Sequence, residues 1–136
     1  MPPSKPVRPE KTLHEVSHEM GLYPVEAYEF VQQGLAYTVR KIHGAAKEEG
    51  RVMRHVSGQD LCEGIRELAL NRWGLLARTV LGKWNIRRTV DFGKIVFAMV
   101  NSGILQATDE DTIEDFKDVY DFGRAFEREY RLEKLI

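Results

Sequence analysis

The segment that most constrains the fold is an apolar stretch late in the chain. Between Thr89 and Gly103, the apolar side chains would cover nearly the whole circumference of a helix: Phe92, Ile95, Val96, Phe97, Met99 and Val100. A helix that is apolar all round is normally buried. We therefore predict that a helix capped by Thr89 and running to Gly103 forms the centre of the core. A chain of 136 residues is long enough to bury such a core within one domain.

Amphipathic helices are expected around this central helix. Apolar residues spaced three and four apart predict helices over residues 12–20, 24–42, 58–73 and 75–84, with a last helix from about residue 123. Pro24 suits the first turn of its helix, and Ser57 suits the N-cap of the next. Residues 1–10 hold four of the five prolines and are expected to form a flexible tail. Residues 11–136 then form a single helical domain.

The order of the last helices resembles a helix-turn-helix. Helices at 58–73, 75–84 and 89–102 give a mainly α fold class, a compact helical domain with a helix-turn-helix-like core. Two alternatives stay open for the chain after residue 103. It forms either a short β-hairpin, as in a winged helix, or an irregular segment over residues 104–122. The aromatic residues over 116–130 are expected to hold this C-terminal part on the core.

Composition limits the compartment and the class of partner. The formal net charge is −1, so the chain lacks the overall positive field of most nucleic-acid binders. Cys62 is the single cysteine, which rules out an internal disulfide and a CxxC site and favours a reducing compartment. No apolar stretch is long enough for a signal peptide or a membrane span. We expect a cytoplasmic protein without a membrane partner.

The charges are segregated along the chain. A basic stretch gives a candidate binding surface made of Arg78, Lys83, Trp84, Arg87, Arg88 and Lys94, in which Asp91 is the one carboxylate. A later stretch gives a candidate acidic surface made of Asp109, Glu110, Asp111, Glu114 and Asp115, and Lys117 is the one cation in its neighbourhood. We interpret both as solvated faces of neighbouring elements. Either face could also meet a partner.

One string of residues looks catalytic. His14-Glu15-Val16-Ser17-His18 matches the H-E-x-x-H pattern, which on a helix offers two imidazoles to zinc and a glutamate as general base. The expected helix is short, follows the proline-rich segment and comes with no evident third ligand. We interpret the match as accidental, keep His14 and His18 as weak metal candidates, and expect no cofactor and no catalytic residues.

Several longer blocks point to a family. YPVEAYEFVQQGLAYTV, RHVSGQDL, GIRELAL, LLARTVL, DFGKIVF and VYDFGRAF follow one another between Tyr23 and Phe126. In these blocks the chain resembles an uncharacterised family of small bacterial proteins. The resemblance implies a complete, stand-alone cytoplasmic protein without an assigned activity. It also implies that the paired histidines are a departure from the family pattern.

Three hypotheses for function follow. The leading one is a non-catalytic cytoplasmic binding or regulatory module that contacts another protein through its charged surfaces. The first alternative is a winged-helix-like nucleic-acid-binding protein that uses the basic stretch. The second is a small zinc-dependent enzyme at His14 and His18. A homo-oligomer is an open alternative as well, because Leu132, Leu135 and Ile136 could pack against a second copy.

Overall fold

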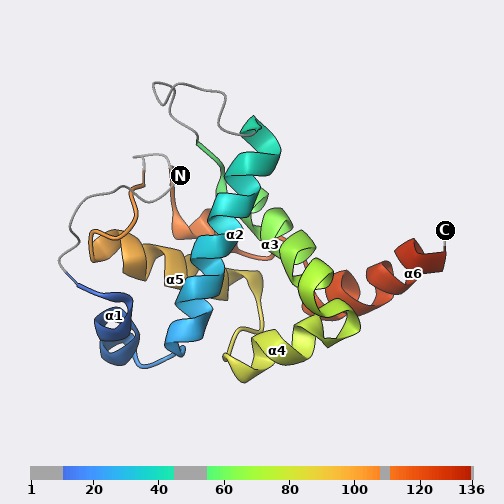
Figure 1. The fold of residues 1–136 in the computed structure, drawn as a ribbon, viewed down its shortest axis with the longest axis horizontal. Helices are drawn as coiled ribbons and strands as arrows, with labels where there is room; N and C mark the ends of the chain where they lie inside the picture. Colours follow the sequence, from blue (N-terminus) through green and yellow to red (C-terminus); the bar gives the residue numbers. More distant parts are fainter. Residues whose placement is uncertain (1–10, 45–54, 108–110, 136) are drawn as a thin grey trace.

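The chain folds mainly into helices in the computed structural model, which describes residues 11–44, 55–107 and 111–135 (Figure 1). The α-helices of these segments are α1 (Leu13–Met20), α2 (Val25–His43), α3 (Gly58–Trp73), α4 (Ala77–Lys83), α5 (Thr89–Asn101) and α6 (Glu129–Leu135). Two 3₁₀ turns, η1 (Gly74–Leu76) and η2 (Ile113–Phe116), and a π-helical turn, η3 (Arg124–Arg128), complete them. No helix in the described parts has the length and apolarity that crossing a bilayer requires. The proline-rich segment 1–10 lies outside the described residues.

Local capping signals fix where the helices begin. The Thr12 hydroxyl accepts the Glu15 N–H at the start of α1, and the Glu15 carboxylate accepts the Thr12 N–H in return. Ser57 and Asp60 form the same reciprocal pair at the start of α3. Such capping boxes satisfy backbone donors that a helix leaves free at its first turn. The predicted helix starts near residues 12 and 58 are therefore confirmed. Pro24 is the N-cap of α2, one residue before the first-turn position predicted for it.

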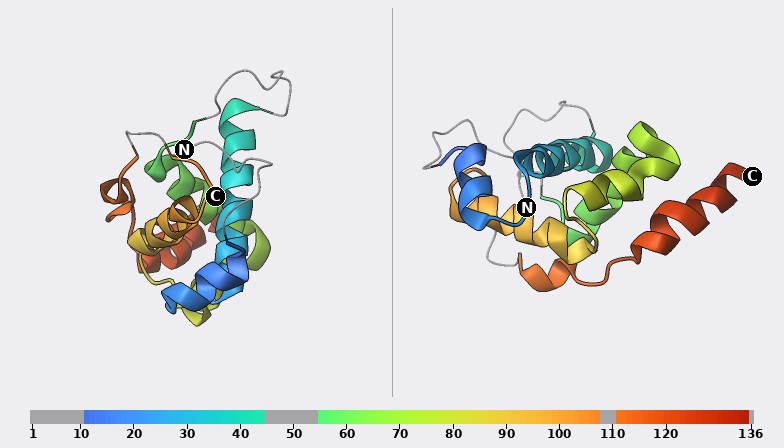
Figure 2. Two further views of the ribbon diagram at one scale, coloured as in Figure 1. Left: turned by 90° about the vertical axis from the view of Figure 1, so that its left-hand side faces the viewer. Right: turned by 90° about the horizontal axis from the view of Figure 1, so that it is seen from below.

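Helix α5 is the central helix of the core. It lies between α2 and η2, which cover opposite faces of it (Figure 2). Of its 13 residues, only Lys94 and Asn101 are exposed. The prediction of a buried central helix is confirmed. The prediction that Thr89 caps it is wrong, because the N-cap is Arg88 and Thr89 is the first helical residue.

Glycines allow α2 and α3 to pack closely. A Cβ atom added to Gly64 of α3 would overlap the Thr38 hydroxyl, and one added to Gly34 of α2 would lie 2.6 Å from Ile65 Cγ1. The Thr38 hydroxyl is itself buried and donates to the Gly34 carbonyl at 2.7 Å. A larger residue at either glycine would push the two helices apart, because buried side chains have little room to move.

Of the two alternatives after residue 103, the β-hairpin does not occur in the residues that the structure describes. No strand occurs over 104–107 or 111–122. The N–H groups of Ile104 and Leu105 instead donate to the Met99 carbonyl, at 2.9 and 3.3 Å. The chain thus closes onto the end of α5, and these backbone groups are no longer free for a β-ladder.

The segment that replaces the hairpin is fixed to α5 by side-chain hydrogen bonds and close packing. The Thr89 hydroxyl donates to the Phe116 carbonyl at 2.6 Å and accepts the Val119 N–H at 3.1 Å. Gly93 of α5 and Gly58 of α3 have no side chain where η2 packs against them. Such side-chain bonds to the backbone compete with regular strand pairing.

Aromatic side chains hold the C-terminal segment on the core, as the sequence predicts. Phe122 stacks on Phe92 with ring centroids 5.9 Å apart and meets Phe126 edge to face at 5.0 Å. The Tyr120 hydroxyl donates to the Cys62 carbonyl at 2.7 Å. Burying two or three rings in this way stabilises an otherwise irregular segment.

We predict that Gly93→Ala destabilises the protein although alanine is the better helix former by about 1 kcal/mol. The new Cβ would lie 2.7 Å from Phe116 Cγ and 2.8 Å from Ile113 Cδ1. Overpacking of this kind costs about 1 to 3 kcal/mol. Urea denaturation should give a free energy of unfolding lower by about 1 kcal/mol or more. Gly82→Ala is the control, because its nearest atom is 3.5 Å away. Equal stability of the two variants would contradict the packing of η2 on α5.

Candidate functional site

A shallow groove runs along the junction between the start of α5 and residues 117–122. Three cavities of about 260, 280 and 100 Å³ form it. The first is lined by Arg88, Val90, Lys94, Lys117 and Asp118, the second adds Arg87, Thr89, Tyr120, Asp121 and Phe122, and the third adds Arg78, Gly82 and Ile86. Neighbouring cavities share lining residues and therefore adjoin one another. We call these residues the α5 groove.

A buried carboxylate fixes one wall of the groove. Asp91 Oδ1 accepts the Tyr23 hydroxyl at 2.6 Å, and Oδ2 accepts the N–H groups of Arg87 at 2.8 Å and Arg88 at 3.0 Å. Hydrogen bonds to an ionised acceptor are among the stronger ones in proteins. Burial and the bond to Asp91 raise the pKa of Tyr23, so its hydroxyl remains a donor at physiological pH. The backbone before α5 is thus held while the two arginine side chains extend outward.

The opposite wall of the groove is formed by residues 117–122, which come directly after η2 in the chain. Asp118 has a φ of +50°, in the left-handed region that aspartate adopts more readily than most residues. The chain turns there, and the Val119 N–H is held by the Thr89 hydroxyl at 3.1 Å. This turn brings Lys117 to the cavity that Arg88 and Lys94 also line.

The groove contains cationic side chains that have no ion-pair partner in the part of the chain that the structure describes. The side chains of Arg88 and Lys94 form no hydrogen bond or ion pair with the described residues. Arg78 pairs with Glu127 at 3.0 Å, and the Arg87 guanidinium donates to a carbonyl. Exposed ion pairs contribute about 0 to 1 kcal/mol, so their members exchange partners readily.

Four members of the predicted binding surface line the groove and two do not. Lys83 is exposed on α4 but lies outside the groove lining. Trp84 is half-buried, with its ring 5.7 Å from the ring of Phe30 and 5.7 Å from that of Trp73. Trp84 therefore belongs to the edge of the core rather than to an open surface.

The predicted acidic surface is only partly described. Asp109 and Glu110 lie outside the described residues. The side chain of Asp111 is 4% exposed and pairs with His55 at 3.2 Å, so it does not present a surface charge. Glu114 is exposed, and Asp115 accepts the Thr112 N–H at 3.1 Å as part of a cap.

The H-E-x-x-H string lies on α1. His14 and His18 are both exposed there. The Glu15 carboxylate accepts the Thr12 N–H at 2.8 Å, and this bond lowers the pKa of Glu15, opposite to what a general base needs. Among the residues with described positions, no three His, Cys, Asp or Glu side chains gather as a metal site. Burial raises the pKa of the Cys62 thiol, which makes it a poor nucleophile.

Sequence reasoning missed the second wall of the groove. Lys117, Asp118 and Asp121 come from the stretch interpreted as acidic, and Phe122 was expected only to support the core. One signal pointed to this wall, since Lys117 is the lone cation in that stretch. Its place beside Arg88 depends on the fold.

Helix α6 extends from the body of the protein (Figure 1). Leu132 and Leu135 are 61% and 82% exposed, and Ile136 lies outside the described residues. The homo-oligomer inferred from these three residues stays a prediction.

Comparison of the chain with protein-family models, with curated proteins and with solved structures gave no match. Any function assigned to the chain therefore rests on its own residues, above all on those of the α5 groove.

We predict that Asp91→Ala lowers the free energy of unfolding by about 2 to 4 kcal/mol, because it leaves buried donors without their ionised acceptor. Tyr23→Phe removes one of these donors and should cost about 1 kcal/mol. Urea denaturation of both variants and of the double variant measures the coupling between the two side chains. Asp60→Ala is the control, since Asp60 has a similar capping role at an exposed site. A loss for Asp91→Ala no larger than the control's would contradict the role of Asp91.

Proposed function

We propose that the chain is a non-catalytic cytoplasmic binding or regulatory module that binds an acidic segment of another protein in the α5 groove. One observation carries the proposal. Arg88 and Lys94 line the same cavity as the apolar side chain of Val90, and neither has an ion-pair partner among the described residues. Cationic side chains beside apolar surface are typical of sites that bind acidic peptides.

The mixture of charges in the groove favours a protein over a nucleic acid. Asp118 and Asp121 lie among the cationic residues, and Phe122 and Ile86 add apolar surface. A nucleic acid carries a phosphate at every nucleotide and could not keep all of them away from Asp118 and Asp121, which costs electrostatic free energy. A peptide avoids that cost, because it can place acidic side chains at Arg88 and apolar ones near Phe122.

Nucleic-acid binding is the second candidate. This candidate takes α3, α4 and α5 as the helices of a helix-turn-helix-like core, whose third helix would enter the major groove. Its polar exposed residues are only Lys94 and Asn101, which offers few contacts to base edges. A zinc enzyme ranks below it, because His14 and His18 lack a third ligand within the described segments.

We predict that acidic peptides bind the full chain and that binding depends on Lys94. An array of peptides that vary in the number and spacing of glutamate and leucine would identify the best binder, and fluorescence anisotropy would measure its affinity. Lys94→Glu and Arg88→Glu should each weaken binding about tenfold or more, equivalent to about 1.4 kcal/mol. Raising the salt concentration should weaken binding by the wild type as well.

Lys83→Glu is the matched control, since Lys83 is another exposed lysine but lies outside the groove. Equal affinities of Lys83→Glu and Lys94→Glu would contradict binding in the groove. Tighter binding of a 20-base-pair duplex DNA than of any peptide, with a steep dependence on salt, would favour the nucleic-acid candidate instead.

A further inference from the structure

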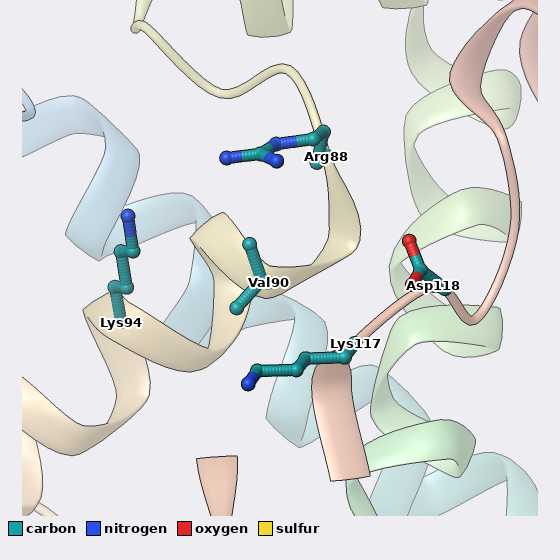
Figure 3. A pocket seen from close by; sticks show the side chains of 5 residues that line it. All are labelled: Arg88, Val90, Lys94, Lys117 and Asp118. Carbon is teal, nitrogen blue, oxygen red and sulfur yellow. The ribbon is translucent and has the colours of Figure 1, made fainter. Parts of the chain in front are cut away.

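We infer that the cavity lined by Arg88, Val90, Lys94, Lys117 and Asp118 is a subsite for a phosphoryl group, carried by a phosphorylated serine or threonine of the partner (Figure 3). The inference rests on the proposed function, because it specifies the acidic group that the α5 groove binds. We call this cavity the phosphoryl subsite.

Three cationic side chains converge on the phosphoryl subsite from separate parts of the chain. Arg88 comes from the turn before α5, Lys94 from α5 itself and Lys117 from the segment after η2. In Figure 3 the side chains of Arg88 and Lys117 extend away from Asp118, toward the side on which Lys94 lies, and the three terminal groups lie around Val90. An anion beside Val90 would therefore face the cations and not the carboxylate.

The charge of the subsite matches a dianion. Three cations and one carboxylate line it, which is an excess of two positive charges among the lining side chains before the ion pair of Lys117 with Glu114 is counted. A phosphorylated serine carries about −1.5 to −2 at pH 7 and offers three acceptor oxygens, whereas a glutamate carries a single negative charge. The Arg88 guanidinium can donate in a fork to two of these oxygens, and the lysines add point charges.

Within the described residues, Lys117 is the one cation of the subsite that has an ion-pair partner. The ion pair between Lys117 and Glu114 has an N–O distance of 2.8 Å, but its side chains are 50% and 69% exposed. A pair this exposed is weak, so Lys117 can turn to a ligand. The Asp91 carboxylate already lies in the first turn of α5 and offsets the partial positive charge of that helix end. The attraction for an anion therefore comes from the three side chains.

The test compares two peptides that differ only in the acidic group. The best acidic peptide from the array would be synthesised with one glutamate replaced by phosphoserine, and both forms would be titrated into the full chain. We expect the phosphoserine form to bind about tenfold tighter at pH 7.5, and its advantage to shrink at pH 5.5, below the second phosphate pKa of about 6. Nuclear magnetic resonance should show the largest amide shifts around Val90, Lys94 and Lys117.

Single substitutions test which side chains produce the preference for the phosphoserine peptide. Lys94→Gln and Lys117→Gln should each reduce the preference for the phosphoserine form, and Lys83→Gln should leave it unchanged. Inorganic phosphate, titrated alone, should bind far more weakly than the phosphopeptide. Equal affinity of the free ion and the phosphopeptide would overturn a peptide source and indicate a site for free phosphate.

The remaining outcomes separate this inference from the proposed function. Equal affinities of the two peptides, both lost in Lys94→Glu, would overturn the phosphoryl subsite and leave the proposed function standing. Failure of the chain to bind either peptide would overturn both.

Discussion

The hydrogen bonds of the Asp91 carboxylate hold together parts of the fold that are distant in sequence. The carboxylate joins Tyr23, which precedes α2, to the backbone of the turn between α4 and α5. A buried carboxylate is costly unless its oxygens accept hydrogen bonds, and here both oxygens do. Because Asp91 accepts hydrogen bonds from the backbone of this turn, the side chains of Arg87 and Arg88 extend from a fixed backbone. Fixed positions lower the entropy that these side chains and their support lose when a ligand binds.

Helix α5 serves both the core and the candidate site. Its buried faces pack against α2 and η2, and its one cationic side chain, Lys94, lies at the groove. Lys117 follows η2 directly, so the packing of Phe116 against Gly93 determines where that second lysine lies. The shape of the groove therefore depends on the packing of η2 on α5. Substitutions in that interface should move Lys117 even though the substituted residues do not line the groove.

The sequence predicted those features that depend on neighbouring residues. Helices begin next to Thr12 and Ser57 as expected, and the apolar stretch of α5 is buried as expected. Features that depend on distant contacts were missed. The Thr89 hydroxyl looks like a cap, but it bonds Phe116 and Val119, which lie 27 and 30 residues away. A short apolar run such as Ile104-Leu105 suits a strand as well as a closing turn, so periodicity cannot decide between them.

Segregation of charge along the sequence does not become segregation on the surface. Lys117 comes from the acidic stretch and joins the cations, while Asp118 and Asp121 line the basic groove. At physiological salt, charges more than about 8 Å apart are largely screened. A ligand in the groove therefore responds to the few charges that line it and not to the net charge of −1. For this reason a nearly neutral chain can hold a local positive excess.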